Sequence, residues 1–254
     1  MSLEITELSL SIGERMLFQP LSLSVARGEV ATIMGPSGIG KSTLLAAIAG
    51  HLDPSITATG HMTLEGQDLA SLAPETRGVG MIFQDPYLFP HLSLGDNLAF
   101  GLRASADRAA RRASIEAALE TAGLAGLYEA DPDTLSGGQK SRASLMRSLL
   151  AEPRALLMDE PFSALDMELR DEMRRFVFAH IRARNIPAVL VTHDPADAEA
   201  ANGPCCQLQR DEIASSSALR SPISAPPDIK RRISLSPISA AVPAPIVLPS
   251  ARNV

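Results

Sequence analysis

The chain has 254 residues, enough for one domain or two small ones, and a hydrophobic content of 45%, enough to bury a substantial core. Its formal net charge of −6 argues against a protein that holds nucleic acid through an overall basic field, so we expect no nucleic-acid partner. No stretch approaches the roughly 18 uninterrupted apolar residues that a membrane helix needs, so a role at a membrane would depend on a partner.

The amino terminus and the cysteines favour a cytoplasmic protein. The first residues, MSLEITELSLSI, alternate apolar and polar side chains, which is typical of a strand and not of a secretory signal peptide. The two cysteines, Cys205 and Cys206, are neighbours in a segment that contains Pro and Ser. That arrangement fits neither a disulfide framework nor a spaced metal site, and a reducing compartment is the simplest location.

Up to about residue 200 the pattern alternates between strands and helices, which predicts an α/β fold. Strands are predicted at residues 3–12, 30–34, 79–83, 155–158 and 188–192. Helices are predicted after Lys41 and at residues 105–122, 139–150 and 168–184. The stretch of about 86–150 is rich in Ala, Leu and Arg and lacks β-branched alternation, so we interpret it as a helical subdomain inserted into the α/β core.

Residues 204–254 differ in composition from the preceding domain at residues 1–203. SPISA occurs at residues 221–225 and again at 236–240, with proline scattered through the segment. Proline removes backbone donors, and the pattern has neither the helical nor the strand period. We therefore expect a Pro/Ser-rich tail that is disordered or atypical. The tail could be a natural extension, or it could result from an altered reading frame, and the sequence leaves both origins open.

Residues 35–43 read GPSGIGKST and lie between an apolar strand and a helical run, the context that the phosphate-loop motif requires. Glycines let backbone N–H groups converge on phosphate oxygens, and the following helix directs its positive dipole end at the same anion. Lys41 is expected to reach the β and γ phosphates, Ser42 to bind magnesium and Thr43 to add a phosphate contact. The predicted nucleotide-binding residues of this loop are Gly35, Pro36, Ser37, Gly38, Ile39, Gly40, Lys41, Ser42 and Thr43.

An acidic pair, Asp159 and Glu160, follows the apolar run at residues 155–158. If that run is a buried parallel strand, both carboxylates face the phosphates. Asp159 would then hold magnesium, usually through water, and Glu160 would be the general base that polarises the attacking water. By itself the pair would suit an ordinary strand end equally well, and it is the phosphate loop that favours the catalytic interpretation.

Residues 135–139 read LSGGQ and precede a helical segment, and at this motif the chain resembles the ABC ATPases. A simpler interpretation is a capping box, because Ser136 and Gln139 have the S-x-x-Q spacing that closes a helix N-terminus. Both interpretations can hold together. The resemblance implies that Ser136, Gly137, Gly138 and Gln139 meet the γ-phosphate of ATP bound by the opposite subunit.

The resemblance spans residues 1 to about 200 and assigns three further residues. Gln84 in MIFQD resembles the Q-loop residue that senses magnesium and the attacking water. His193 in LVTHD resembles the switch histidine that contacts the γ-phosphate, and Asp166 in SALD resembles the D-loop residue that links the two active sites of a dimer. Asp166 is also a candidate cap for the following helix. The implied catalytic residues are Glu160, His193 and Gln84, and the implied metal ligands are Ser42, Gln84 and Asp159.

The resemblance also implies a fold and a set of partners. The fold is an α/β P-loop NTPase with a RecA-like, mostly parallel core, an antiparallel β subdomain and an inserted helical subdomain. Two copies would close head to tail over two ATP molecules with Mg²⁺. The segments that follow Gln84 and surround LSGGQ are similar to bacterial importer subunits of the thiamine, ferric-iron and polyamine type, and to Ynj-type importer ATPases. Such a subunit lies peripherally on the cytoplasmic face of the inner membrane, bound to integral membrane permease subunits and indirectly to a periplasmic substrate-binding protein.

One position departs from the family pattern. Family members usually stack adenine on an aromatic residue about two dozen positions before the phosphate loop, where this chain has Ile12, with Phe18 as a candidate substitute. Two other functions are also open. One is a soluble ABC ATPase acting in DNA repair or translation, and the other is a subunit that binds nucleotide without hydrolysing it. The transported solute is open as well.

Overall fold

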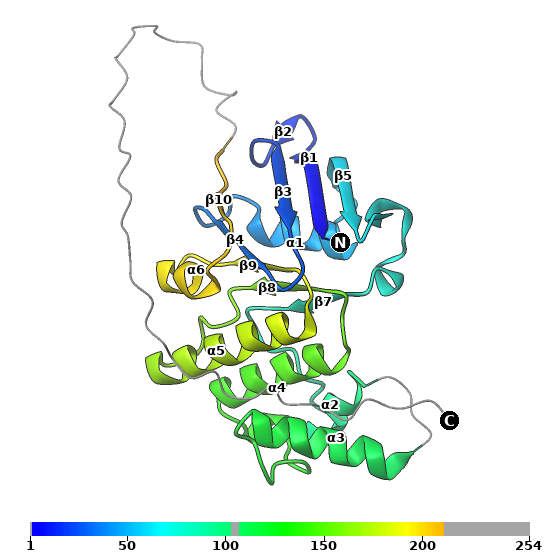
Figure 1. Cartoon of the computed structure of the whole chain (residues 1–254), viewed down its shortest axis with the longest axis vertical. Coiled ribbons are helices and arrows are strands. Elements are labelled where there is room, and N and C mark those ends of the chain that lie inside the picture. The colour runs from blue at the N-terminus through cyan, green and yellow to red at the C-terminus, as the bar shows by residue number, and fades with distance from the viewer. Residues whose placement is uncertain (1, 103–106, 211–254) are drawn as a thin grey trace, which may run out of the picture. The chain divides into compact units, whose positions relative to one another are not determined.

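The computed structural model describes residues 2–102 and 107–210. The tail predicted at residues 204–254 therefore lies mostly outside the described residues, as do both SPISA segments and the first positions of the helix predicted at 105–122. Within the described residues, two sheets and six α-helices make up the structure (Figure 1).

A five-stranded parallel sheet forms the centre of the fold (Figure 1). Its strands, in spatial order, are β10 (Cys205–Gln207), β4 (Val30–Met34), β9 (Ala188–Val191), β8 (Ala155–Asp159) and β7 (Val79–Ile82). Every neighbouring pair is parallel. Parallel neighbours need crossover connections, and at least one helix lies between successive strands of this sheet along the chain, so the α/β prediction is confirmed.

The second sheet is antiparallel and matches the expected β subdomain. It contains β1 (Leu3–Ile12), β2 (Arg15–Met16), β3 (Leu21–Val25), β5 (Ile56–Leu64) and β6 (Gln67–Asp68). β1 pairs with β2, β3 and β5, and β5 pairs with β6. The register shifts at Glu7, whose φ of 48° is positive, and Gly60 on β5 accommodates the close backbone there.

The six α-helices of the described residues are α1 (Lys41–Ala49), α2 (Leu94–Ala99), α3 (Arg108–Thr121), α4 (Gly137–Leu150), α5 (Met167–Arg184) and α6 (Pro195–Ala201). Four of the six helices, α1, α3, α4 and α5, lie close to predicted segments, α2 falls within the predicted helical subdomain, and α6 was not predicted. Short 3₁₀ turns occupy Leu69–Ser71, Pro74–Thr76 and Pro132–Thr134. Across the described part of residues 86–150 the regular elements are α2, α3, α4 and the last of these turns, without a strand. In the described residues, no helix combines the length and the apolar character needed to span a bilayer.

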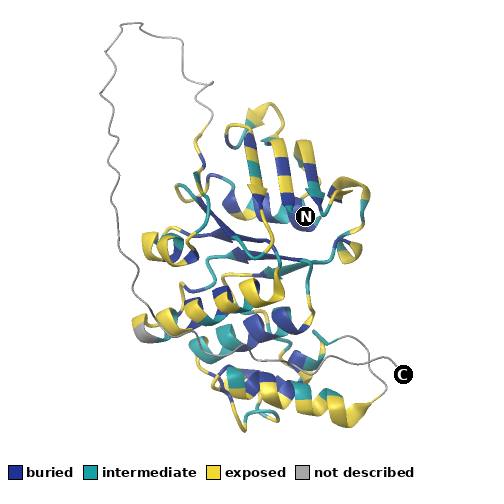
Figure 2. Ribbon diagram, viewed as in Figure 1, coloured by how far each residue is buried: buried dark blue, intermediate teal, exposed yellow. Residues whose placement is uncertain are grey.

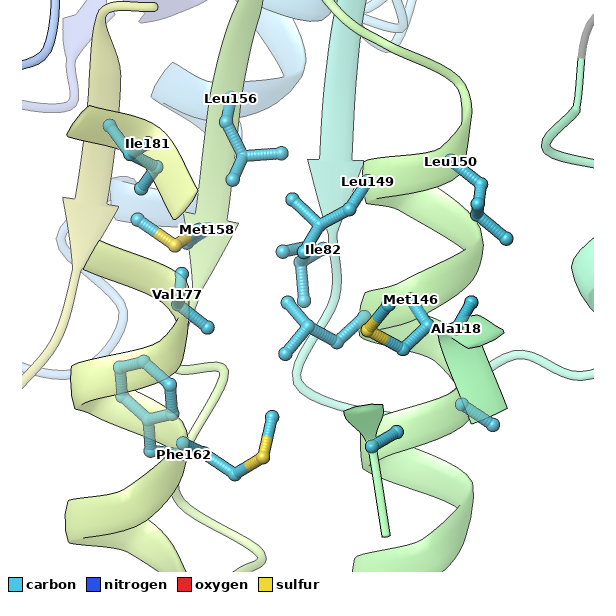
Figure 3. Packing of buried hydrophobic residues seen from close by; sticks show 14 of the residues in the cluster. Ile82, Ala118, Met146, Leu149, Leu150, Leu156, Met158, Phe162, Val177 and Ile181 are labelled. Carbon is cyan, nitrogen blue, oxygen red and sulfur yellow. The ribbon is translucent and has the colours of Figure 1, made fainter. Parts of the chain in front are cut away.

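The parallel sheet is buried on both faces, and each face contacts its own hydrophobic core (Figure 2). On β8, Leu156 and Met158 belong to the core under α4 and α5, whereas Ala155 and Leu157 belong to the core that includes α1 and the antiparallel sheet. Successive side chains of a strand point to opposite faces, so a short apolar run serves both cores. Figure 3 shows the first core, where side chains of α4 and α5 meet those of β7 and β8.

The sheet continues beyond residue 203, where the sequence pattern places the end of the domain. Cys205, Cys206 and Gln207 form β10 and pair in register with residues 32–34 of β4. Leu208 follows and is buried in the second core. The short apolar alternation of CCQL is the only local signal for this strand, and it is masked by the polar and Pro-rich residues around it.

His180 on α5 provides a test of the packing. It lines a small cavity with Leu149, Pro153 and Ile186, near the ion pair between Arg184 and Glu152. Burial, together with the charge of Arg184, lowers the pKa of His180 from 6.5 to about 4. Between these two pH values the unfolded state binds more protons than the folded state, so the folded state loses stability as the pH falls through this window.

We predict that replacing His180 with Gln weakens the pH dependence of stability. Urea unfolding at intervals between pH 7 and pH 4 should show the wild type losing more free energy of unfolding than His180→Gln does over that range. Above pH 7 the two proteins should have the same slope, because His180 is then neutral in both states. Parallel curves over the whole range would contradict the buried, neutral histidine.

Candidate nucleotide-binding and hydrolysis site

The predicted motifs leave the parallel sheet at the carboxyl ends of four strands. The phosphate loop begins at Gly35, directly after β4, and Glu160 directly follows β8. His193 comes two residues after the end of β9, and Gln84 two residues after the end of β7. In open α/β sheets this edge is where ligands bind, because loops and helix N-termini gather there.

The strand register places these ends at one level. Val191 of β9 lies between Ile33 of β4 and Asp159 of β8, and Ile82 of β7 lies beside Met158. Segments that are separated by more than a hundred residues in the chain therefore emerge side by side. The sheet brings the phosphate loop, the acidic pair and the histidine segment together, with the Gln84 segment on the β7 flank.

The phosphate loop joins β4 to α1 as predicted. Gly40, just before the helix, has a φ of 108°, and a Cβ there would approach Leu17 and Phe18 at 3.2 to 3.4 Å. The Lys41 ammonium donates hydrogen bonds to the carbonyls of Gly35, at 2.8 Å, and Pro36, at 3.1 Å, so it lies over the loop. The N–H of Ile39 donates to the carbonyl of Pro36 at 3.4 Å, and the other N–H groups of the loop and those that begin α1 are available to an anion.

The remaining loop residues differ in how they can take part. Ser37 and Gly38 are exposed, as is Ser42 on the first turn of α1, and Thr43 is partly buried. The side chain of Ile39 is buried in the second core, so this residue can offer a ligand only its backbone. The loop is thus fixed to the core by the Ile39 side chain and presents polar groups at its exposed surface.

Asp159 lies at the meeting point of the phosphate loop and the acidic pair. Burial raises the pKa of its carboxyl, whereas a hydrogen bond with the Ser42 side chain lowers it. The neighbouring Glu160 carboxylate raises this pKa and the positive charge of Lys41 lowers it. A partly buried carboxylate beside a second carboxylate favours binding of a cation, and Ser42 and Asp159 both present oxygen, the donor that Mg²⁺ prefers.

Glu160 and His193 face each other at the edge of the sheet. The Nδ1 atom of His193 lies 3.1 Å from Oε2 of Glu160, and the histidine side chain is 67% exposed while that of the glutamate is 18% exposed. Glu160 has a φ of 46°, and its backbone N–H donates to the carbonyl of Val191 at 2.9 Å. Its carbonyl accepts hydrogen bonds from the N–H and hydroxyl groups of Ser163. A residue held in this sparsely populated backbone region is typical of functional sites.

Asp166 and Gln84 lie at the periphery of this arrangement. Asp166 caps α5, because its Oδ1 accepts the N–H of Leu169 at 3.0 Å, and the predicted capping role is confirmed. Gln84 is exposed, and its side chain forms no hydrogen bond with any other residue that the structure describes. Gln84 thus follows β7 at the edge of the sheet, with a side chain that is unpartnered among the described residues.

The LSGGQ segment begins α4 with a complete capping box. The N–H of Gln139 donates to the Ser136 hydroxyl at 3.3 Å, and the N–H of Ser136 donates to Oε1 of Gln139 at 2.9 Å. The predicted capping box is confirmed. Ser136 and Gly137 are exposed, and an added Cβ at Gly137 would meet no atom of the described residues within 4 Å. Among the described residues, no hydrogen bond or ion pair connects this segment to the phosphate loop.

The two candidate contacts to the nucleotide base have opposite environments. Ile12 is 49% exposed at the end of β1, whereas Phe18 is completely buried in the second core and backs Gly40. The suggestion that Phe18 substitutes for a stacking aromatic residue is therefore wrong, because its ring faces are covered by the core.

The structure also reveals supporting residues that motif reasoning misses. Leu208, after β10, lies against the phosphate loop, since its carbonyl and Cβ would meet a Cβ at Gly35 within 3.4 Å. On α5, Arg170 contacts the carbonyl of Leu165, after Glu160, and Arg174 contacts the carboxylate of Asp194, after His193. Their four-residue spacing is a sequence signal for one helix face, but it does not reveal what that face contacts.

Comparison with known proteins is consistent with this geometry. Residues 18–163 match the ABC transporter family profile. The chain is 45% identical over 196 residues to the uncharacterized ABC transporter ATP-binding protein YnjD of Escherichia coli, an alignment that covers 77% of this chain and 90% of that protein. It is 49% identical over 172 residues to the thiamine import ATP-binding protein ThiQ of Cereibacter sphaeroides, covering 67% of this chain and 73% of the relative.

A solved structure shares the fold. It is a dimeric post-hydrolysis state of the ATP-binding cassette MJ0796 bound to ADP and Pi, which matches with a TM-score of 0.70 and 26% identity over 82% of this chain and 94% of that chain. The sheet order, the phosphate loop and the sequence relatives agree. This chain belongs to the ABC transporter family and is an ATPase related to the ATP-binding subunits of importers.

Proposed function

We propose that this chain is the ATP-hydrolysing subunit that powers solute import through a partner membrane permease. The observation that supports this most directly is the position of Lys41, Asp159, Glu160 and His193 at one edge of the parallel sheet. Several relatives are import ATP-binding proteins by name, for thiamine, aliphatic sulfonates and sulfate/thiosulfate. The solute itself would be selected by the permease and the periplasmic substrate-binding protein, which are separate chains.

In this proposal Glu160 is the general base of hydrolysis. It accepts a proton from water as the water oxygen bonds to the γ-phosphorus, and the bridging oxygen leaves with ADP. His193, 3.1 Å from the Glu160 carboxylate, orients that carboxylate and contacts the γ-phosphate. Lys41 and the N–H groups of the phosphate loop bind the phosphates, and Gln84 approaches from the β7 flank to orient the water.

The donor set fits Mg²⁺. In the described residues, no three His, Cys, Asp or Glu side chains are grouped so as to hold a metal ion by themselves. Ser42 and Asp159 instead provide a hydroxyl and a carboxylate beside the phosphate loop. In this proposal Gln84 would add an amide oxygen. Phosphate oxygens would complete the coordination sphere, as is usual for this ion. When bound, Mg²⁺ would neutralise the charge of the phosphate oxygens.

The signature segment supports a head-to-tail homodimer. Ser136 and Gly137 are exposed at a helix N-terminus that is already capped, so further donors of the first turn point outward. Among the described residues, this segment makes no hydrogen bond with the phosphate loop of its own chain. The solved relative is dimeric. We infer that Ser136, Gly137, Gly138 and Gln139 complete the ATP site of the partner copy. In this arrangement Asp166 lies at the same dimer interface.

An exposed apolar patch supports docking to a permease on the cytoplasmic face of the membrane. We call Phe83, Tyr87, Phe89 and Phe100 the aromatic patch. The rings of Phe83 and Tyr87 are 5.4 Å apart, those of Phe89 and Phe100 are 4.9 Å apart, and Arg147 contacts both Tyr87 and Phe89. Tyr87 is 61% exposed and Phe100 69% exposed. Apolar groups gathered in this way on a surface mark an interaction site.

We predict that Glu160→Gln reduces the ATPase rate by about 10² to 10⁴, because the general base is lost. The variant should still bind ATP with Mg²⁺ and, since it does not hydrolyse it, should accumulate as a dimer in light scattering. A matched control is Glu152→Gln, another glutamate with positive φ, whose exposed side chain lies on a different loop. If Glu160→Gln turned over ATP near the wild-type rate, or formed no dimer in the presence of ATP, the role of Glu160 as general base would be refuted.

The environment of Ile12 predicts weak selectivity for the base. An exposed aliphatic contact lacks the π-face interaction of an aromatic ring, so GTP and ATP should compete about equally for the site in a titration against a fluorescent nucleotide. Ile12→Tyr should tighten ATP binding by about fivefold or more, since stacking on a base contributes roughly 1–3 kcal/mol. A strong ATP preference in the wild type would count against this prediction.

The aromatic patch predicts a separation between transport and hydrolysis. We expect the genes beside the one for this chain to encode a permease and an exported receptor, and the chain to co-purify with that permease.

Tyr87→Ser combined with Phe100→Ser should abolish this co-purification and leave the ATPase activity of the isolated chain within about twofold of the wild type. Thr57→Ala, an exposed position on β5, is the control. Undiminished co-purification of the double variant would rule the patch out.

A further inference from the structure

Two arginines on the first turns of α5 form a polar network next to the proposed catalytic groups. Arg170 and Arg174 are four residues apart, so both lie on the same face of the helix. Arg174 is only 7% exposed. Buried arginines are uncommon unless they are paired, so each hydrogen bond that these two side chains make bears on why they lie there.

Arg174 holds the backbone on both sides of His193. Its Nε donates to Oδ1 of Asp197 at 2.5 Å, and its Nη2 donates to Oδ2 of Asp194 at 2.9 Å. The other oxygen of Asp197 accepts the Thr192 hydroxyl at 2.6 Å, and that hydroxyl in turn accepts the N–H of Asp194 at 3.0 Å. The residues before and after His193 are therefore both tied to α5 through a closed ring of hydrogen bonds.

Arg170 connects the same ring to the segment after Glu160. Its Nη1 donates to Oδ2 of Asp194 at 3.2 Å, the oxygen that Arg174 also contacts. Its Nη2 donates to the carbonyls of Leu165, at 3.1 Å, and Ser163, at 3.4 Å. One guanidinium thus spans the turn that leads to Asp166 and the loop that carries His193.

The geometry of His193 makes this backbone support important. Its side chain is 67% exposed and its one polar contact among the described residues is the Glu160 carboxylate. The packing around an exposed imidazole cannot fix its direction, so the position of its backbone must. That backbone is flanked by Asp194, which both arginines contact, and by Thr192, which is held through Asp197 by Arg174.

We propose that Arg170 and Arg174 are positioning residues that hold His193 in place for hydrolysis, and that Arg170 couples the position of His193 to the segment of residues 163–166. This inference rests on the proposed role of His193. Since Asp166 faces the partner copy in the proposed dimer, a shift of this segment on closure would move Arg170 and, through Asp194, the loop of His193. Turnover would then depend on closure.

Arginine suits position 170 because its side chain donates hydrogen bonds to several acceptors at once. A planar guanidinium presents several N–H groups in fixed directions and can serve two carbonyls and a carboxylate together. Lysine keeps the positive charge but has a single nitrogen, which cannot span both segments. Arg170→Lys therefore preserves the charge beside Asp194 and removes the connection to Leu165 and Ser163.

The first test compares Arg170→Lys with Arg175→Lys, an exposed neighbour on the same helix. We expect Arg170→Lys to lower kcat about tenfold and to change the KM for ATP by less than about twofold, because nucleotide binding relies on the phosphate loop. Arg175→Lys should match the wild type. An unchanged kcat in Arg170→Lys would overturn the proposal, and so would a rise in KM in proportion to the fall in kcat.

The second test asks whether Arg170 acts through His193. In a double-mutant cycle, Arg170→Lys should have little further effect on kcat in a His193→Ala background. The same tenfold loss in both backgrounds would sink this inference and leave the proposed function intact. Normal turnover in His193→Ala alone would instead refute the role of His193 and the inference with it, while the loss in Glu160→Gln would still identify the ATPase site.

A spectroscopic measurement covers the case in which the His193→Ala background is too slow to measure. In the nucleotide-free protein with isotope-labelled histidine, Arg170→Lys should shift or broaden the imidazole signals of His193, assigned by their absence in His193→Ala. The signals of His180, on the same helix α5, should not move, which shows that the helix is intact. Unchanged His193 signals would overturn the proposal.

Discussion

Backbone hydrogen bonds between β4, β9 and β8 hold Ile33, Val191 and Asp159 side by side, and the segments proposed to bind and hydrolyse nucleotide start from that row. Parallel pairing is what allows this, because it turns the carboxyl ends of strands far apart in the chain toward one edge. The apolar cores on both faces then fix the register, since a slip of one residue would exchange the side chains that face the two cores.

A rigid sheet makes it possible to keep groups at the site that are unfavourable by themselves. Asp159 is partly buried next to Glu160, and burial raises the pKa of its carboxyl, whereas Ser42 and Lys41 lower it. Glu160 also has a left-handed backbone that its bonds to Val191 and Ser163 maintain. The fold supports both features through interactions away from the reacting atoms.

Helix α5 joins two parts of the site that the sheet alone does not connect. The sheet positions the ends of β8 and β9, but the loop of His193 and the turn before Asp166 extend beyond it. Arg170 and Arg174 tie both segments to one helix, and the face that carries them continues into Val177 and Ile181 of the first core. An ionic network partly shielded from water holds such loops more firmly than exposed pairs would.

By itself the sequence determined the fold class, four of the five parallel strands and the helices α1, α3, α4 and α5, and it predicted the chemistry of the site. Those features depend on local periodicity and on motifs whose residues are contiguous, such as residues 35–43. Only the tertiary structure decided which segments meet. It showed that Phe18 is a core residue, that Cys205–Gln207 form an edge strand beside β4, and that Arg170 reaches both Leu165 and Asp194. A side chain's partners across the fold depend on strand order and helix packing, and no local pattern encodes them.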